Sequence, residues 1–244
     1  MDFTGKKVLV TGGSRGIGKN IVYSFAKAGA TVIINYNKSY DSCLKIKEEI
    51  DEKYEECFLV KADVSDETEV KEMFSLIKKQ FGEIDIVINN AGIAMDNLIE
   101  FKTADSFREV LNVNLVGTFL VSKYAVDVLS NNSSIINISS DNAIWGYPES
   151  IDYDASKAGV ISLTHNFAKE YAPKTRVNCI LPGWVNTDMN KELNEEQILD
   201  INKKNLLGRF AEPDEISNVI LFLASDDASY VNSSTIVVNG GKNE

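Results

Sequence analysis

The stretch KVLVTGGSRGIGKNIVYSFAKA, residues 7–28, joins a short apolar run to a glycine-rich turn and an amphipathic helical pattern. This order predicts a buried strand, then the turn, then a helix over residues 17–28. A helix N-terminus gathers unpaired backbone N–H groups and a partial positive charge, so such a turn is suited to a phosphate. Gly12, Gly16 and Gly18 would allow a pyrophosphate to approach closely. The spacing differs from the G-x-G-x-x-G fingerprint, so the turn alone is equally consistent with a simple strand-to-helix connection.

The alternation of strand and helix continues along the chain. Short apolar and β-branched runs predict strands over residues 7–11, 31–35, 57–61, 84–89, 134–139, 176–181 and 235–238. Helical periodicity predicts helices over residues 17–28, 39–52, 67–81, 105–130, 152–172, 188–207 and 213–224. Strands separated by helices imply right-handed crossovers and a parallel sheet. The chain has no internal repeat or linker, so we expect one α/β domain over residues 1–244.

Composition describes an acidic protein with enough apolar residues for a sizeable core. Of the 244 residues, 44% are hydrophobic, and 36 acidic against 25 basic side chains give a net charge of −11. This negative charge argues against general affinity for nucleic acid or an anionic membrane. The chain has no apolar run of about 18 residues, and its first residues lead into a strand without a signal peptide. We therefore expect a cytoplasmic protein.

The few histidines and cysteines argue against several kinds of site. His165 is the single histidine, which leaves almost no material for a His-based metal site or a Ser-His-Asp hydrolase, so we expect no metal. Cys43, Cys57 and Cys179 are scattered, lack C-x-x-C spacing and lie in apolar contexts typical of reduced core residues.

Polar or glycine-containing segments follow several predicted strands directly. Ligands of a parallel sheet bind beyond the carboxyl ends of its strands, so these segments are candidates for one shared site. They are residues 11–18, 35–38, 63–64, 89–92, 139–140 and 182–187.

A second motif, SDNAIWGYPESIDYDASK over residues 140–157, offers acid–base chemistry. On a helix, Tyr153 and Lys157 are one turn apart, so both side chains project from the same face. A free tyrosine has a pKa of about 10, and a neighbouring cation favours its ionised form. Ser140, at the end of the preceding strand, could offer a hydroxyl to a substrate carbonyl. Taken alone, a Tyr-x-x-x-Lys pattern is more often a solvated helix face.

Asn114 is a polar residue within the apolar run NVNLVGTF, inside the long helix predicted over residues 105–130. Two interpretations are open at this point. Asn114 could be a core residue satisfied by backbone groups, or it could mark a helix kink or a proton relay.

The order and spacing of these motifs resemble the short-chain dehydrogenase/reductase family over essentially the full chain. The matching motifs are TGGSRGIG at residues 11–18, Asp63-Val64, NNAG at residues 89–92, Asn114, Ser140, Tyr153 with Lys157, and PGWVNT at residues 182–187. Each motif is weak alone, but their combination is highly specific. The resemblance implies a Rossmann-type, doubly wound parallel sheet of about seven strands with helices on both faces. It also implies an NAD(P)-dependent oxidoreductase acting on CH-OH or C=O groups.

The resemblance assigns roles to four residues. Tyr153 would protonate the carbonyl oxygen during reduction, or act as the base during oxidation. Ser140 would hydrogen-bond that oxygen, and Lys157 would lower the pKa of the tyrosine and hold the nicotinamide ribose. Asn114 would support a water relay toward Lys157. Ser139 competes with Ser140, but strand neighbours face opposite ways and the thirteen-residue spacing to Tyr153 matches Ser140.

The same resemblance implies a set of cofactor-binding residues. They are Gly12, Ser14, Arg15, Gly16, Ile17, Gly18, Asn37, Lys38, Asp63, Val64, Asn89, Ala91, Gly92, Tyr153, Lys157, Pro182, Gly183, Val185 and Thr187. An NAD site usually places an acidic residue about twenty residues after the loop begins. Here the strand end reads NYNK over residues 35–38, with no acid before Asp41, and Arg15 with Lys38 could pair with a 2′-phosphate. We expect NADPH as cofactor, with NADH less favoured.

Within the family, residues 206–231 and the VNGG at residues 238–241 are most similar to bacterial 3-oxoacyl-(acyl-carrier-protein) reductases of fatty acid biosynthesis. Asn232-Ser233 departs from the Thr-Gly that the family commonly has there. The similarity implies reduction of a 3-oxoacyl thioester by a homotetramer packed through the helices carrying Asn114 and Tyr153 and the C-terminal region. The substrate would lie under a covering segment near residues 184–207.

Three functional alternatives stay open from the sequence. The substrate could be carrier-linked, or it could be a free or coenzyme A-linked ketone or secondary alcohol. Less favoured is a non-catalytic NADP(H)-binding regulator, since Ser140, Tyr153, Lys157 and Asn114 are all present. The turn over residues 130–134 lacks cations, and the loop before the next strand offers only Lys174 and Arg176. An acidic acyl carrier protein would therefore need another basic surface, for which we name Lys191, Lys203, Lys204 and Arg209.

Overall fold

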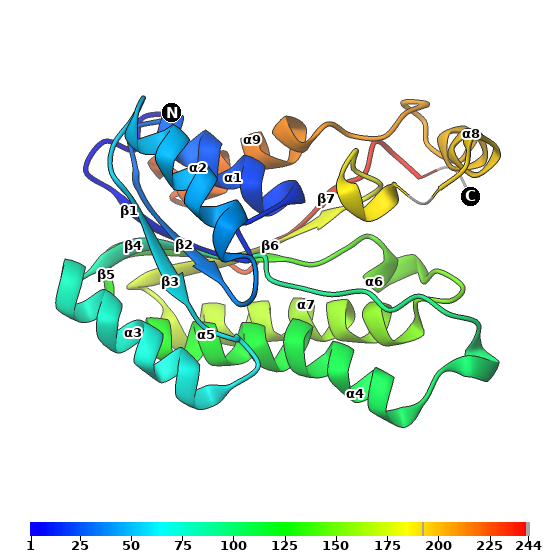
Figure 1. The fold of residues 1–244 in the computed structure, drawn as a ribbon, viewed down its shortest axis with the longest axis horizontal. Coiled ribbons are helices and arrows are strands. Elements are labelled where there is room, and N and C mark those ends of the chain that lie inside the picture. Colours follow the sequence, from blue (N-terminus) through cyan, green and yellow to red (C-terminus); the bar gives the residue numbers. More distant parts are fainter. Residues whose placement is uncertain (192, 243–244) are drawn as a thin grey trace.

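The computed structural model describes residues 1–191 and 193–242, and it has a single seven-stranded parallel sheet (Figure 1). The strand order is β3-β2-β1-β4-β5-β6-β7, so the chain starts in the middle of the sheet, builds one half, then returns to build the other. The strands are β1 Lys7–Thr11, β2 Thr31–Tyr36, β3 Cys57–Lys61, β4 Ile84–Asn89, β5 Leu129–Ile138, β6 Thr175–Pro182 and β7 Thr235–Val238. The predicted Rossmann-type α/β class is confirmed.

Helices cover both faces of the sheet, as Figure 1 shows. One face carries α1 Gly16–Lys27, α2 Tyr40–Asp51 and α9 Pro213–Ala224, and the other carries α3 Glu67–Phe81, α4 Ala104–Leu111, α5 Gly117–Ala125 and α7 Ile151–Tyr171. Strand residues alternate between the two cores: Val8 and Val10 pack with the first set of helices, and Leu9 packs with the second. This two-sided burial explains why the strands read as continuous apolar runs.

The long helix predicted over residues 105–130 is interrupted in the structure. After α4, a π-helical turn spans Asn112–Val116, and α5 then ends at Ala125. The next strand begins at Leu129, five residues earlier than predicted, because Leu129 pairs with Ile84 across an irregularity in the register. The polar run SNNSS gave no local indication of that pairing.

The continuous helix predicted over residues 188–207 is wrong. The chain instead forms a 3-10 turn at Asp188–Asn190 and the separate helix α8 Glu195–Lys203, and residue 192 lies outside the described residues. Helix α8 begins at a capping box, in which Asn194 accepts from the backbone of Gln197 and the Gln197 side chain accepts from Asn194. Leu206 leaves the helical path because its N–H bonds the carbonyl oxygen of Gly241 at 2.8 Å. Among the described residues, no helix combines the length and apolar character needed to span a bilayer.

Candidate active site

The carboxyl ends of β1 and β4 bring the glycine-rich turn against the NNAG segment. Gly12 has φ +64°, and a Cβ added there would lie 2.9 Å from the Cα of Ala91. Gly16, with φ +53°, faces Thr187 across the cleft, since its Cβ position is 3.7 Å from the Thr187 side chain. Three separate loops therefore meet here, at Gly12, where a Cβ would clash, and at Gly16, where the positive φ favours glycine. This cradle fits the phosphates of a dinucleotide.

The N-terminus of α1 completes the cradle. Its N-cap residue, Arg15, makes no side-chain hydrogen bond to the first turn, so the leading N–H groups stay available for an anion. Arg15 itself is exposed, and Ser14 is partly exposed beside it. Ile17 packs on the core and Gly18 is buried, so both anchor the helix start rather than face the cleft.

Asn90 is a residue of this site that the sequence reasoning did not select. Its Nδ2 donates to the carbonyl oxygens of Thr11 and Gly12, both at 3.0 Å. Its backbone N–H donates to Thr11 Oγ1 at 3.0 Å. Asn90 thus fixes the start of the glycine-rich turn against β4. Its position inside the NNAG motif could have identified it from the sequence.

The ends of β2 and β3 hold the other predicted cofactor residues. Asn37 Nδ2 donates to Asp63 Oδ2 at 2.7 Å, and exposed Lys38 lies nearby. Although burial acts to raise it, hydrogen bonds from Ser65 and Asn37 lower the pKa of Asp63 below its ordinary value. Val64 is buried and packs where Gly117 leaves space for it. These side chains form one wall at the end of the cradle.

Asn89 differs from its neighbours because its side chain turns into the interior. Its Nδ2 donates to Ser122 Oγ at 2.9 Å and to Asn137 Oδ1 at 2.8 Å, and Asn137 in turn donates to Thr164. Any contact of Asn89 with a cofactor would therefore come from its backbone. Ala91 and Gly92 do border the cleft.

Asn114 lies in the π-helical turn and is fully buried. Its Oδ1 accepts from the backbone N–H of Ile93 at 2.8 Å, and its Nδ2 donates to the carbonyl oxygen of Ile93 at 2.9 Å and to Ser156 Oγ at 3.0 Å. A Cβ added at Gly92 would lie 3.2 Å from Asn114 Oδ1 and 3.5 Å from Lys157 Nζ. The structure thus places Asn114 and Lys157 both next to Gly92. Asn114 is satisfied by backbone groups and Ser156, and it lies at a helix irregularity, whereas the proton relay stays a prediction.

Tyr153, Lys157 and Ser140 come together as predicted. Lys157 Nζ lies 5.5 Å from the centroid of the Tyr153 ring, and the Ser140 hydroxyl is near enough to the phenol to lower its pKa. Ser139 turns away, since its Oγ donates to the carbonyl oxygen of Lys157 at 2.8 Å. The choice of Ser140 over Ser139 therefore matches the observed geometry.

The expected effect of Lys157 on the tyrosine is not seen. Burial raises the pKa of Tyr153 to about 12, against the opposing hydrogen bond with Ser140, and the nearby carboxylates of Asp154, Asp96 and Asp141 add to the rise. Burial also lowers the pKa of Lys157 to about 8. In both groups burial disfavours the charged form, because the pocket is poorly solvated. The phenol is therefore held protonated, in the form needed to donate a proton.

The loop after β6 closes the site from the other side. Asp141 N–H donates to the carbonyl oxygen of buried Pro182 at 3.0 Å, which ties this loop to the segment carrying Ser140. Gly183 passes so close to Asn239 that a Cβ would lie 2.7 Å from the Asn239 side chain. Buried Val185 is bridged to Ala211. These contacts hold the loop that ends at Thr187 over the glycine-rich turn.

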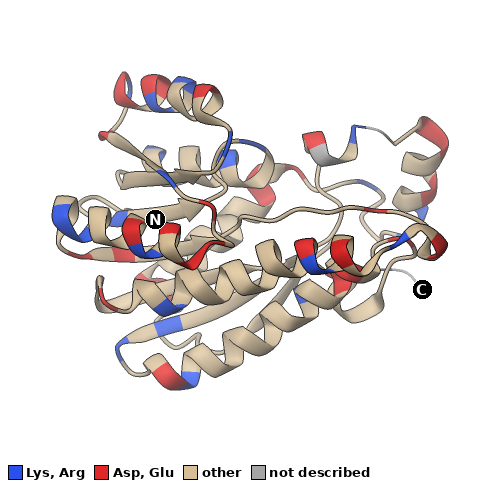
Figure 2. Cartoon of the chain, turned by 60° about the horizontal axis from the view of Figure 1, so that its bottom comes forward, with Lys and Arg blue, Asp and Glu red and all other residues tan. Residues whose placement is uncertain are grey.

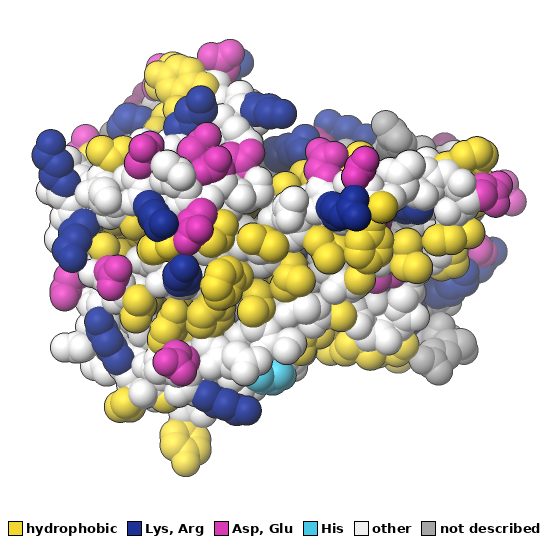
Figure 3. Space-filling model, turned by 90° about the horizontal axis from the view of Figure 1, so that it is seen from below, with side chains coloured by type: hydrophobic (Ala, Val, Ile, Leu, Met, Phe, Trp, Pro, Cys, Tyr) yellow, Lys and Arg dark blue, Asp and Glu magenta, His cyan; other side chains and the backbone are white. Residues whose placement is uncertain are grey.

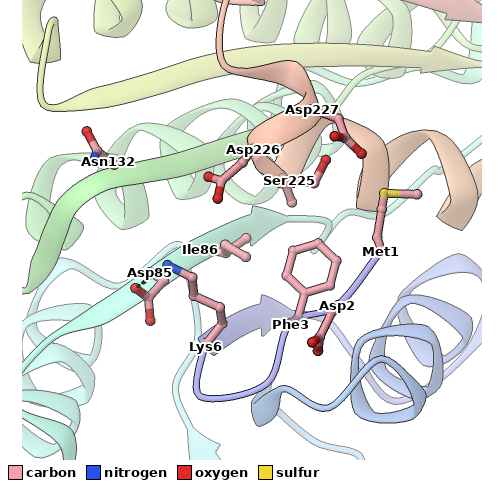
Figure 4. Close-up of a pocket in the computed structure, with 11 residues that line it drawn as sticks. Met1, Asp2, Phe3, Lys6, Asp85, Ile86, Asn132, Ser225, Asp226 and Asp227 are labelled. Atoms are coloured by element: carbon pink, nitrogen blue, oxygen red, sulfur yellow. Dashed lines mark hydrogen bonds and ion pairs between the residues drawn. The ribbon is translucent and has the colours of Figure 1, made fainter.

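Another cleft lies at the amino ends of β1 and β4, away from this cradle (Figure 4). It contains four carboxylates and one lysine, and it lacks the Tyr, Ser and glycine-rich elements of the first site. Its lining is Met1, Asp2, Phe3, Lys6, Asp85, Ile86, Asn132, Ala224, Ser225, Asp226 and Asp227. We therefore assign the chemistry to the carboxyl edge of the sheet.

A dinucleotide cradle beside a Ser-Tyr-Lys group defines a Rossmann-type oxidoreductase. Comparison with known proteins agrees: the family model described as Enoyl-(Acyl carrier protein) reductase matches residues 12–243. The chain belongs to the short-chain dehydrogenase/reductase family and is an NAD(P)-dependent oxidoreductase acting on carbonyl or hydroxyl groups.

The similar proteins span essentially the whole chain. The 3-oxoacyl-(acyl-carrier-protein) reductase of Thermotoga maritima is 39% identical, with 99% of each chain covered. The enzyme of the same name from Aquifex aeolicus is 40% identical, with 97% of each covered. A short-chain dehydrogenase from Burkholderia cenocepacia, solved in complex with NADP, is 28% identical, with a TM-score of 0.94 and 100% of both chains covered.

Proposed function

We propose that this protein reduces a 3-oxoacyl thioester to the 3-hydroxyacyl product with NADPH, as a 3-oxoacyl-(acyl-carrier-protein) reductase of fatty acid biosynthesis in the cytoplasm. The observation that carries the proposal is the near-complete coverage at 39–40% identity by relatives of that name. The Ser140 hydroxyl beside the Tyr153 phenol supports it, because two hydroxyls aimed at one oxygen suit a ketone.

Each residue of the group has a definable task. When bound, the nicotinamide supplies the hydride for the carbonyl carbon. Ser140 donates a hydrogen bond to the carbonyl oxygen and orients it, and Tyr153 delivers a proton to that oxygen. Lys157 holds positive charge beside the phenolate that Tyr153 becomes. Asn114, with its partners at Ile93 and Ser156, keeps the backbone beside Gly92 in place and supports the route by which a proton returns.

NADPH preference rests on the charges at the ribose end of the cradle. No acidic residue follows β2 before Asp41, and Asp63 is already bonded to Asn37. Exposed Arg15 and Lys38 can pair with a 2′-phosphate. The solved relative from Burkholderia cenocepacia, which holds NADP, supports the same preference.

Most of the cations proposed to dock an acyl carrier protein already interact with groups of the chain itself, which weakens the case for that docking surface. Arg176 donates to the carbonyl oxygens of Leu223, Ser225 and Val231, so it stabilises the fold. Each of the four named surface cations is paired within the chain: Lys191 with Asp188, Lys203 and Lys204 with Asp200, and Arg209 with Glu215. Acidic positions accompany the basic ones along the surface helices (Figure 2). We therefore infer that carrier docking is weak, and that a coenzyme A-linked substrate remains the alternative.

A homotetramer is part of the proposal. An apolar band crosses the face formed by α4, α5 and α7 (Figure 3). Its large exposed members on these helices and the adjoining segment are Leu98, Ile99, Phe101, Val116, Phe119 and Ile151. Exposed apolar patches of this kind mark association surfaces. Sedimentation equilibrium of the purified protein would test the expected four-subunit mass.

The function is tested with a matched set of substrates and NADPH oxidation as the signal. We expect the largest kcat/KM with a 3-oxoacyl thioester on acyl carrier protein, a lower one with its coenzyme A counterpart, and little with free ketones. The matching 2-enoyl thioester is the control for the other reduction that the family description allows. Faster turnover of the enoyl thioester would contradict the proposal. No turnover of any substrate, together with tight NADPH binding, would point to the regulator instead.

A further inference from the structure

We propose that Lys102, through Asp152, is a positioning residue for Tyr153. The two side chains form a buried ion pair: Lys102 is 6% exposed and Asp152 is 0% exposed, and Nζ lies 2.7 Å from both carboxylate oxygens. Taking two charges out of water is costly, and the attraction between them offsets this cost only when the geometry is good and further hydrogen bonds satisfy both groups. The other described ion pairs of this chain are far more exposed.

Asp152 passes the constraint to the tyrosine. Its Oδ1 accepts the backbone N–H of Tyr153 at 2.9 Å, in the first turn of α7. That N–H has no intrahelical acceptor in the first turn, so the carboxylate is its partner. A negative charge is also favourable at a helix N-terminus. The carboxylate thus fixes the start of the helix from which the phenol projects.

Lys102 ties the same point to the segment that leaves Gly92. Its Nζ also donates to the carbonyl oxygen of Met95 at 2.5 Å. Two further bonds run between the same segments: Ser150 Oγ donates to Asp96 Oδ1 at 2.6 Å, and Asn97 N–H donates to the carbonyl oxygen of Glu149 at 3.0 Å. The segment between the cofactor cradle and α4 is therefore held against the start of α7.

A second clamp acts on the other backbone group of Tyr153. Ser156 Oγ donates to the carbonyl oxygen of Tyr153 at 2.6 Å, and Asn114 donates to Ser156 Oγ at 3.0 Å. Asn114 also holds Ile93, at the beginning of the same segment. The tyrosine is thus fixed at its N–H through Asp152 and Lys102 and at its C=O through Ser156 and Asn114. Loss of Lys102 would release one of the two and leave the Asp152 charge buried without a partner.

The test compares Lys102→Met, Asp152→Asn and the double variant, with Lys6→Met as control. Lys6 also pairs with an aspartate, Asp85, but at 3.5 Å and with 45% of its side chain exposed, at the amino ends of the central strands β1 and β4. We expect Lys102→Met to lower kcat by about 10-fold to 100-fold, the scale expected when a reacting group is misplaced. The KM for NADPH should change less than about threefold, since Tyr153 is misaligned while the phosphate cradle is intact.

The double variant separates positioning from a general loss of stability. The Asp152→Asn change keeps an acceptor for the Tyr153 N–H without an orphan charge, so the Lys102→Met/Asp152→Asn protein should recover at least about fivefold in kcat over Lys102→Met. A folded Lys102→Met protein with kcat within twofold of wild type overturns the inference. A double variant whose kcat is no higher than that of Lys102→Met also overturns it. If Lys102→Met does not fold, the double variant is compared with wild type instead.

This inference rests on the proposed reduction, so a second readout is independent of substrate. Amide hydrogen exchange of peptides covering residues 146–157 should be faster in Lys102→Met than in wild type or Lys6→Met. Unchanged exchange would overturn the positioning role. An inactive wild-type protein with the expected exchange pattern would instead contradict only the proposed substrate.

Discussion

Lys157 Nζ donates to the backbone carbonyl oxygen of Ile138 at 2.8 Å, so the lysine of α7 is held by the strand that leads to Ser140. This contact links α7, which carries Tyr153, to the end of β5, two residues before Ser140. It also places an ammonium where burial lowers its pKa to about 8. Its charge is therefore present below about pH 8 and lost above it.

The first prediction is the resulting pH profile. We expect kcat/KM for reduction to be constant below about pH 8 and to fall about tenfold per unit above it, as Lys157 loses its proton while Tyr153 keeps its own. Lys157→Arg keeps the charge at all these values, so its lower activity should show no break near pH 8. The same break in that variant would assign it to another group.

The second prediction concerns the proton donor. Tyr153→Phe should lower turnover by about 100-fold to 10,000-fold, the usual contribution of an acid–base group, with NADPH affinity within a few fold of wild type. Tyr147→Phe is the matched control, because Tyr147 lies in the same segment but is 39% exposed and packs on Trp184. Stopped-flow rates keep the comparison limited by chemistry. A Tyr153→Phe enzyme with more than about a tenth of wild-type turnover would show that another group donates the proton.

The third prediction tests cofactor choice at the exposed N-cap of α1. Arg15→Ala should raise the KM for NADPH by about tenfold and leave the KM for NADH nearly unchanged, because a bond to the 2′-phosphate is lost. Lys19→Ala, one turn further along α1, is the control for a general loss of positive charge. Equal effects on both cofactors would mean that Arg15 binds the shared pyrophosphate.

The fourth prediction uses the paired lysines of α8. Asp200 lies 4.0 Å from Lys203 and 3.6 Å from Lys204, so Asp200→Asn frees two cations without adding any. If the carrier docks here, this variant should bind acyl carrier protein more tightly at low salt, and Lys203→Glu/Lys204→Glu more weakly. Titration of the carrier measures both. Three indistinguishable Kd values would eliminate α8 as the docking surface.

The fifth prediction concerns the loop between β6 and β7. Ser233 has φ +57°, and its Oγ lies 2.9 Å from His165 Nδ1. Ser233→Ala should lower the free energy of unfolding by about 1 kcal/mol, because it loses the hydrogen bond and keeps the strain. Ser233→Gly loses the same bond but relieves the strain, so it should exceed the alanine variant by about 0.5–1 kcal/mol. Ser234→Ala, whose hydroxyl makes only a 3.5 Å contact, should be neutral in urea unfolding. Equal stability of the alanine and glycine variants would argue against strain at Ser233.

Local periodicity was sufficient for most of the sheet. Strands β1, β3, β4 and β7 begin and end at the predicted residues, because each is a short run rich in apolar residues; β1 and β4 lie inside the sheet and are mostly buried, whereas β3 and β7 are its edge strands and are partly exposed. The early start of β5 and the path of residues 203–207 depend instead on partners far along the chain, such as Ile84 and Gly241. No local pattern contains that information.

The site divides in the same way. Motifs placed Ser140, Tyr153, Lys157 and Asn114 at one edge, and the structure brings them together. Two features were outside the reach of sequence reasoning. The pKa shifts arise from burial, and the partners Lys102 and Asp152 are 50 residues apart without any shared motif.

The π-helical turn at Asn112–Val116 holds one more residue than an α-helical turn would. Its widened backbone is compensated locally, since Thr118 Oγ1 donates to the carbonyl oxygen of Asn114 at 2.7 Å. Relative to an uninterrupted α-helix, the added residue rotates every following side chain by about 100° around the helix axis. This rotation sets how the side chain of Asn114, which bonds Ile93, is oriented relative to the apolar face of α5. Whether Asn114 reaches the site therefore depends on the number of residues in this turn and not on any one side chain.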